Sequence, residues 1–239
     1  MTILQQTLAP KIHTTYGKPQ YNYVKGNIQR IELHRGCPWQ HEYCYEPKIN
    51  EDFPIPQIIK NHVQILDMNL LARKDALEII KELGKKKVSC TSLGIIREKV
   101  VYYEAVCGFD YRFLTQEIAI ALKQSRFFNI RMAWDGSIKN QYRIKDVLGM
   151  FLKADYKPKQ IMFFMIVNWK IPKEECERKL DIMKVWNVKV CDCCYDGGYK
   201  YATPTDWTAK ELKEFRAKCR KHNQIINFGI DPEVKEAQP

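Results

Sequence analysis

The sequence has no long apolar run, and its first residues do not predict a secretory leader. No window of the 239 residues approaches the roughly 18 consecutive apolar residues that predict a membrane-spanning helix. Residues 1–6 lack the charged, apolar and small-residue succession of a signal peptide. We therefore expect a soluble, cytoplasmic protein without a membrane partner.

Linkers and repeats are missing as well. There is no internal repeat, no low-complexity block and no Ser/Gly-rich linker, so nothing suggests a second domain. Residues 1–27 have no sustained periodicity and contain Pro10 and Pro19, which indicates an irregular arm. We expect one folded domain over residues 28–230 and a tail over residues 231–239, since an apolar content of 45% suffices for one sizeable core.

The cysteines do not form a disulfide pattern. Nine cysteines are many for a cytosolic core, yet their odd number and irregular spacing do not fit a disulfide framework in a chain of this size. A reducing compartment in which some thiols bind a metal fits better. Four isolated thiols are interpreted as small buried apolar side chains, namely Cys90, Cys107, Cys176 and Cys219.

Acidic residues are few relative to basic ones. The 28 Asp and Glu residues stand against 39 Lys and Arg residues, which gives a net charge of +11. Such a charge attracts phosphates, so a nucleic acid, a nucleotide or an acidic protein is a candidate partner. The lysines are also spread over several predicted helices, where they can serve solubility alone. Composition leaves both interpretations open.

After residue 27 the sequence alternates between β-rich runs and helical periodicity, which is typical of βα units with a mostly parallel sheet. Strands are predicted at residues 28–34, 62–66, 100–106, 129–134, 160–167 and 188–194, and helices at residues 75–83, 115–122, 145–153, 174–186 and 209–222. Gly84 is predicted to cap the first of these helices and Thr115 to begin the second. Six strands are too few for an eight-stranded barrel, so we expect the α/β class and an open, partial (β/α)6 TIM-like barrel.

One loop carries candidate metal ligands. Cys37, His41 and Cys44 follow the first predicted strand with three and then two residues between them. Gly36 allows a tight turn into this loop. The active site of an α/β barrel lies at the carboxyl ends of its strands, which is where the loop is expected. Three donors at this spacing can surround one compact metal centre.

This loop resembles that of the radical S-adenosylmethionine (SAM) superfamily, in which cysteines spaced C-x3-C-x2-C follow the first barrel strand and an aromatic residue precedes the last. The match is at Cys37, Tyr43 and Cys44, and His41 stands where the family has its middle cysteine. The resemblance extends over roughly residues 28–200. Polar segments after the later strands also resemble the family, namely Leu66-Asp67-Met68-Asn69, Cys107-Gly108-Phe109-Asp110-Tyr111-Arg112, Ala133-Trp134-Asp135 and Val167-Asn168.

The resemblance implies an iron–sulfur enzyme. In the family, a 4Fe-4S cluster binds the amino and carboxylate groups of SAM, and reductive cleavage of SAM gives a 5′-deoxyadenosyl radical that abstracts hydrogen from a substrate. The resemblance then implies that Cys37, His41 and Cys44 hold the cluster, with SAM and an electron donor such as flavodoxin or ferredoxin as partners. Six residues are candidates for the SAM pocket: Tyr43, Asp67, Asn69, Trp134, Asp135 and Asn168.

His41 leaves several hypotheses open. Imidazole can bind cluster iron, but loss of a thiolate tends to raise the potential of a cluster that must act as a strong reductant. The loop is consistent with a working His-ligated cluster, with an inactivating or engineered replacement, and with a descendant that has abandoned SAM chemistry. Two hypotheses lie outside iron–sulfur enzymes. One is a degenerate scaffold that binds nucleic acid or a protein through its basic surface. The other is a Cys2His zinc clip, for which the local sequence offers no fourth ligand. The purely structural alternative is that Cys37 and Cys44 are two buried thiols and that His41 lies near them by chance.

The polar residues at the strand ends have structural alternatives. Asp67 and Asn69 favour tight turns, and Asp135 precedes a glycine in a turn-forming pair. Asp110 and Arg112 fit a surface ion pair or a loop anchor as well as a substrate contact.

Three further cysteines crowd the last predicted strand. Because side chains alternate along a strand, Cys191 and Cys193 are expected on one face and Cys194 on the other. One strand cannot direct all three at one metal, so an auxiliary cluster or zinc site is not favoured there.

Overall fold

The computed structural model describes residues 18–39, 41, 43–44, 50–92, 95–195 and 207–229. These residues form two compact units. The amino-terminal unit contains the described residues of Ile12–Arg131 and Asp146–Tyr156, and the carboxy-terminal unit contains those of Met132–Lys145 and Lys157–Pro239.

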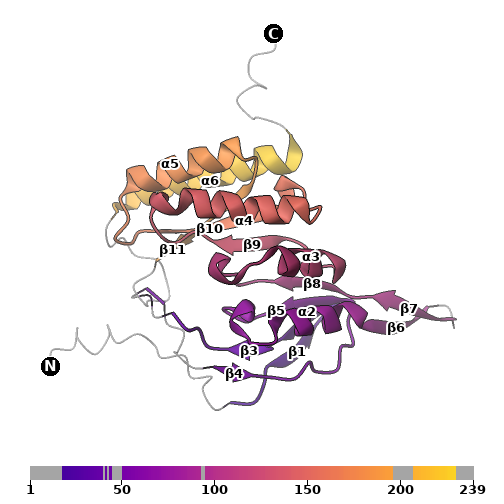
Figure 1. Cartoon of the computed structure of the whole chain (residues 1–239). Coiled ribbons are helices and arrows are strands. Elements are labelled where there is room, and N and C mark those ends of the chain that lie inside the picture. The colour runs from indigo at the N-terminus through magenta and orange to yellow at the C-terminus, as the bar shows by residue number, and fades with distance from the viewer. Residues whose placement is uncertain are drawn as a thin grey trace, which may run out of the picture. The chain divides into compact units, whose positions relative to one another are not determined.

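The amino-terminal unit is built on a four-stranded sheet in the order β1-β2-β5-β8 (Figure 1). Its strands are β1 (Asn22–Lys25), β2 (Ile28–Ile31), β5 (His62–Ile65) and β8 (Tyr102–Ala105). β2, β5 and β8 run parallel to one another, and β1 is antiparallel to β2. The carboxyl ends of the three parallel strands therefore share one edge of this sheet.

Two smaller antiparallel pairs accompany the sheet. β3 (His34–Arg35) pairs with β4 (Glu51–Asp52), and β6 (Lys87–Ser92) pairs with β7 (Ile95–Val100) in a hairpin that extends away from the sheet in Figure 1. The sequence patterns did not predict this hairpin. β7 exposes Ile96 and Val100 beside charged residues, so it lacks the alternation of apolar and polar side chains by which a half-buried strand is recognised.

Helices α2 (Ala76–Lys85) and α3 (Gln116–Gln124) of this unit contact each other. Tyr103 of β8 is fully buried, and its hydroxyl donates a hydrogen bond to the carbonyl oxygen of Leu83 in α2 at 2.8 Å. The sheet face that carries Tyr103 is therefore the one that packs on the helices. Thr115 caps α3 as predicted, because its hydroxyl accepts the N–H of Ile118.

Gly84 does not end α2, contrary to the prediction. The helix continues to Lys85, and its C-cap residue is Lys86. A Cβ atom on Gly84 would lie 2.6 Å from Ser125 Oγ and 3.2 Å from Ser125 Cα. The missing side chain thus lets α2 approach the end of α3 closely, and the glycine serves packing in place of capping.

The carboxy-terminal unit has a three-stranded sheet in the order β11-β10-β9. Its elements are β9 (Ile130–Ala133), α4 (Gln141–Lys153), β10 (Ile161–Val167), α5 (Lys173–Val185), β11 (Lys189–Cys194) and α6 (Ala209–Phe228), with β9 and α4 shared between the two units. β10 and β11 are parallel, and α5 and α6 contact each other and β11 (Figure 1). α6 begins with a capping box in which Thr208 and Glu211 satisfy each other's backbone N–H groups.

Each predicted strand and helix has a counterpart, although the ends differ. The first predicted strand is split into β2 and β3, α4 begins earlier than predicted, and α6 continues past the predicted end at residue 222. Single turns of 3-10 helix are η1 (Leu70–Ala72), η2 (Tyr111–Phe113), η3 (Ile138–Asn140) and η4 (Pro158–Gln160). The fold is mixed α/β with parallel portions, and the described strands form no closed barrel. No helix in the described ranges has the length and apolar character needed to cross a membrane.

Candidate active site

The loop with the candidate metal ligands leaves β3 in a fixed direction. Arg35 at the end of β3 is buried, and its guanidinium donates to Glu32 Oε2 at 2.6 Å and to Glu51 Oε2 at 3.0 Å. Gly36 follows with a φ of 102°, a backbone conformation that favours glycine. The turn directs Cys37 into the protein interior, where this residue is only 9% exposed.

Cys37 meets a predicted cofactor residue from the neighbouring strand. Asn69 follows β5, and its Nδ2 atom donates a hydrogen bond to Cys37 Sγ over 3.8 Å. The two residues are 32 positions apart in the sequence. They come together because β2 and β5 are parallel, so the segments that follow both strands lie at the same edge of the sheet. Asn69 is 1% exposed, and the contact is therefore shielded from water.

Asp67 and Asn69 also carry buried oxygen atoms without a partner. Asp67 Oδ1 accepts a hydrogen bond from Leu33 N–H at 2.8 Å. Among the described residues, no group donates to the second carboxyl oxygen of Asp67 or to Asn69 Oδ1. Burial raises the pKa of Asp67 to about 8, so this carboxyl group holds a proton at neutral pH. Buried polar atoms that lack partners indicate a place where a ligand can bind.

The segment after β8 packs on the metal loop. Arg112 and Asp110 form a two-point ion pair with N–O distances of 2.6 and 2.8 Å. The Arg112 guanidinium lies 4.0 Å from the ring centroid of Trp39, and the Trp39 and Phe113 ring centroids are 6.0 Å apart. The ion-pair interpretation of Asp110 and Arg112 is confirmed. The pair also holds Trp39 of the loop through a cation–π contact.

The remaining loop residues are close neighbours of one another. The rings of His41 and Tyr43 stack with their centroids 5.0 Å apart and 8° between their planes, and Cys44 N–H donates to the His41 carbonyl oxygen at 2.9 Å. Burial lowers the pKa of His41, which favours neutral imidazole. The described residues contain no group of three His, Cys, Asp or Glu side chains placed to hold a metal ion. Cys37, His41 and Cys44 are thus of suitable donor types for cluster iron, but their described side chains are not gathered around one point.

Three further predicted residues belong to the carboxy-terminal unit. Trp134 is fully buried and stacks on Trp186 with ring centroids 5.8 Å apart, so its indole is part of this unit's core. Asn168 is fully buried with a φ of 60°. Its Nδ2 donates to the Tyr195 carbonyl oxygen at 2.8 Å, and its Oδ1 accepts Trp207 N–H at 3.4 Å. Trp134 and Asn168 therefore hold their own unit together.

Asp135 lies near a buried lysine that the sequence patterns did not single out. Lys179 is 0% exposed, and its Nζ donates to the Gly136 carbonyl oxygen and lies 3.8 Å from Glu175 Oε1. Burial lowers the pKa of Lys179, while the negative charges of Glu175 and Asp135 oppose that change. A lysine within helical sequence gives no sign of such burial, because only the packing of α5 decides it.

A row of polar side chains across the amino-terminal sheet was also missed. Arg30, Gln64 and Glu104 lie opposite one another on β2, β5 and β8. Arg30 Nε donates to Gln64 Oε1 at 3.0 Å, and Gln64 Nε2 donates to Glu104 Oε2 at 3.0 Å. Glu104 is 5% exposed and also accepts Arg131 Nη2 at 2.6 Å. The row faces away from the helices, because Tyr103, the neighbour of Glu104 in β8, faces α2.

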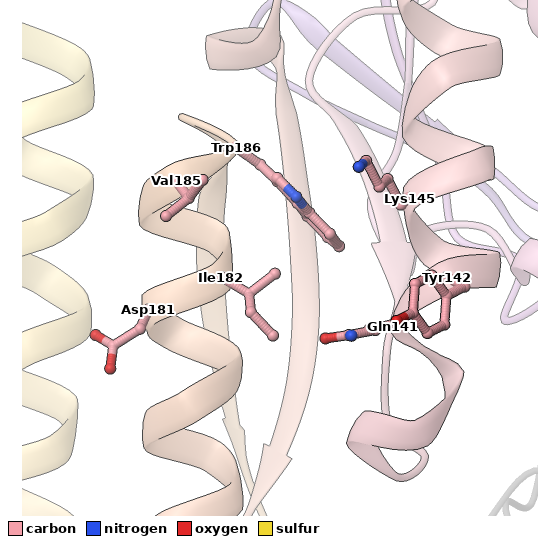
Figure 2. Close-up of a pocket in the computed structure, with 7 residues that line it drawn as sticks. All are labelled: Gln141, Tyr142, Lys145, Asp181, Ile182, Val185 and Trp186. Carbon is pink, nitrogen blue, oxygen red and sulfur yellow. The ribbon is translucent and has the colours of Figure 1, made fainter.

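A groove of about 320 Å³ lies in the carboxy-terminal unit between the beginning of α4 and the end of α5 (Figure 2). Its lining is largely apolar and consists of Gln141, Tyr142, Lys145, Asp181, Ile182, Val185 and Trp186. None of the predicted site residues lines it. We place the candidate active site at the Cys37 loop, because Cys37 meets Asn69 there beside buried oxygen atoms that lack a partner among the described residues.

Comparisons with known proteins supply no relative. A scan against protein-family models finds no match to this chain, and a search of curated proteins finds none either. The likeness to radical SAM enzymes therefore stays an inference from the loop and the strand ends.

Proposed function

We propose that this protein is an iron–sulfur enzyme that reductively cleaves SAM and so starts radical chemistry on a substrate. One observation carries the proposal: Cys37 meets Asn69 at the carboxyl edge of the parallel strands, beside buried oxygen atoms of Asp67 and Asn69 that lack a partner among the described residues. Cys37, His41 and Cys44 would hold a 4Fe-4S cluster. Bound there, the cluster would supply the electron that breaks a carbon–sulfur bond of SAM.

The donor set supports this assignment. Thiolates are the usual ligands of iron–sulfur clusters, and imidazole replaces them in some. The hydrogen bond from Asn69 to Cys37 Sγ fixes the orientation of this sulfur and stabilises negative charge on it. The guanidinium of Arg112 holds the loop by its contact with Trp39, so the direction of the loop is set from the β8 side as well.

Asp67 and Asn69 are suited to the amino end of SAM. Asn69 Oδ1 is a buried acceptor, and an ammonium group is a strong donor. The same ammonium would favour ionised Asp67, so binding of the amino group would lower the pKa of Asp67 from about 8 and release its proton. We keep Tyr43 of the same loop in the proposed pocket. Trp134, by contrast, is engaged in the core of its own unit.

The charge of the chain supports an acidic electron donor. A net charge of +11 attracts negatively charged proteins and accelerates their encounter. A flavodoxin or ferredoxin is a donor of this kind, and the charge would assist its docking.

Anaerobic cluster reconstitution tests the proposal. Iron and sulfide would be measured in the unaltered protein and in His41→Cys, Cys37→Ala and Cys107→Ala, together with 5′-deoxyadenosine released from SAM under reducing conditions. Cys107→Ala is the matched control, because its thiol lies in the same unit and donates to the Leu66 carbonyl oxygen at 3.3 Å without belonging to the loop. We expect iron, sulfide and 5′-deoxyadenosine from the unaltered protein and Cys107→Ala, and none from Cys37→Ala.

The other outcomes separate the alternatives. A cluster and SAM cleavage in His41→Cys alone would mark this chain as an inactivated form. Zinc without sulfide that is present in the unaltered protein and lost in Cys37→Ala would identify a Cys2His clip at the loop. Absence of iron from all variants would refute the enzyme and leave a basic scaffold, for which salt-dependent binding to polyanions is the next measurement.

A further inference from the structure

The end of β11 carries two thiols on one face. Asp192 points toward α6, since its Oδ2 accepts Arg216 Nε at 2.8 Å. Side chains alternate along a strand, so Cys191 and Cys193 point to the opposite face, where they lie beside Phe164 and Ile166 of β10 in the parallel register. Both cysteines are partly exposed. The pair is therefore directed away from the helix that covers β11.

The two sulfur atoms are close enough to share one ion. Cys191 Sγ and Cys193 Sγ are 3.9 Å apart. Two thiolates on one tetrahedral Zn²⁺ with bonds of about 2.3 Å lie about 3.8 Å from each other. The two side chains already hold their sulfurs at this separation, so binding would require little rearrangement. A disulfide fits less well, because residues two apart in a strand have Cα atoms roughly 6.6 Å apart, near the upper limit for a bridge.

The charge around the pair favours a cation, in contrast to the basic chain as a whole. The hydrogen bond with Cys191, burial, and the negative charges of Asp135 and Asp192 raise the pKa of the Cys193 thiol. A bound cation would offset the repulsion that thiolates would meet from these carboxylates. Soft thiolate donors select Zn²⁺ and similar thiophilic ions over Mg²⁺ or Ca²⁺.

We propose that Cys191 and Cys193 chelate one thiophilic divalent ion, Zn²⁺ in the first place. Binding joins the ion to both sulfurs and releases the two S–H protons to solvent, and no electron is transferred. The described residues offer no group of three such donors, and two thiolates fill two of the four positions of a tetrahedral ion. The site is independent of the proposed cluster, because its donors come from β11.

Cadmium titration tests the site, since Cd²⁺ replaces Zn²⁺ and its bonds to thiolates absorb in the ultraviolet. The titration would use reduced, metal-free protein with Cys37→Ala and Cys44→Ala, which removes the thiols of the loop. Onto this background, Cys191→Ser with Cys193→Ser removes the proposed site. Cys176→Ser with Cys219→Ser is the matched control, because these two thiols are fully buried in helices.

We expect one equivalent of Cd²⁺ with thiolate absorption in the background and in the control, its displacement by Zn²⁺, and its loss in the Cys191/Cys193 variant. Equal absorption in that variant, or no absorption in the background, would overturn the proposal whether or not a cluster forms at the loop. A second measurement covers variants that fail to fold. Phenylarsine oxide, which bridges two adjacent thiols, should leave one adduct in the unaltered protein on residues 191 and 193, and an adduct-free peptide there would also refute the site.

Discussion

Asp67 should make the free energy of unfolding depend on pH in an unusual direction. Its pKa is raised from 3.8 to about 8, chiefly by burial, and the backbone N–H groups of Leu33 and His34 act against that rise. At pH values between about 4 and about 8, Asp67 keeps its proton in the native state and releases it in the unfolded chain. Stabilisation from this group is therefore complete below about pH 4 and is lost as the pH rises through about 8. Ordinary paired carboxylates do the reverse.

The expected magnitude follows from the shift. Each pH unit within the window changes the free energy of unfolding by about 1.4 kcal/mol, so the interval from about pH 5 to about pH 8 accounts for about 4 kcal/mol. Asp67→Asn cannot titrate, and the amide can still accept the N–H of Leu33 at one oxygen. The free energy of unfolding of Asp67→Asn should thus lack this dependence on pH, while the hydrogen bond from Leu33 is kept.

Urea unfolding of metal-free protein, followed by tryptophan fluorescence at several pH values, measures this difference. We expect the unaltered protein to lose stability relative to Asp67→Asn as the pH rises from 5 to 8. Asp181→Asn is the control for removal of a carboxylate, because Asp181 is 69% exposed and pairs with Lys184 on the surface of α5. Parallel pH profiles for the unaltered protein and Asp67→Asn would contradict the assigned burial of this carboxyl group.

Three further substitutions test the packing, each by urea unfolding at constant pH. Gly84→Ala should lower the free energy of unfolding by about 1–3 kcal/mol, since the new Cβ would lie 2.6 Å from Ser125 Oγ. Adding Ser125→Ala should restore part of this loss. A Gly84→Ala variant more stable than the unaltered protein would show that the two helices separate easily. Glu104→Gln should cost about 2 kcal/mol, because it leaves Arg131 without its anionic partner, and a neutral result would mean that water replaces the contact. Thr208→Ala should cost about 1 kcal/mol through loss of the α6 cap, and an unchanged midpoint would refute the capping role.

Local patterns predicted the elements well wherever one face is buried. Thr115 was recognised as a cap because its hydroxyl can satisfy a backbone N–H three residues on, which needs no knowledge of the rest of the fold. Gly84 was misassigned for the opposite reason: its role depends on Ser125 at the end of α3, and no local rule describes a contact between two helices. The prediction of a partial barrel is open for the same reason, since the strand order within each sheet does not decide it.

The sequence predicted where the candidate site lies, but it did not predict which side chains touch there. Spacing placed Cys37 in a loop after the first strand, and strand ends placed Asn69 and Asp67 near it. The bond between Asn69 and Cys37 depends on the parallel register of β2 and β5, which the sequence does not state. The row that contains Arg30 and Glu104 was missed for the same reason. The alternation of side chains along a strand assigns each residue to a face of the sheet, but its neighbours on that face depend on the register of the strands.

The surroundings of the thiols distinguish a ligand from a core residue better than the thiols themselves do. Cys176 is fully buried, and burial raises its pKa to about 12, which keeps it protonated and confirms its interpretation as a small apolar side chain. Cys37 is buried as well, but it receives an amide hydrogen bond from Asn69 and lies within electrostatic reach of the Arg112 guanidinium. A core thiol needs neither a hydrogen-bond donor nor a cation beside it. The case for Cys37 as a ligand therefore rests on what surrounds it, which is independent of the loop spacing and would hold if His41 were any other residue.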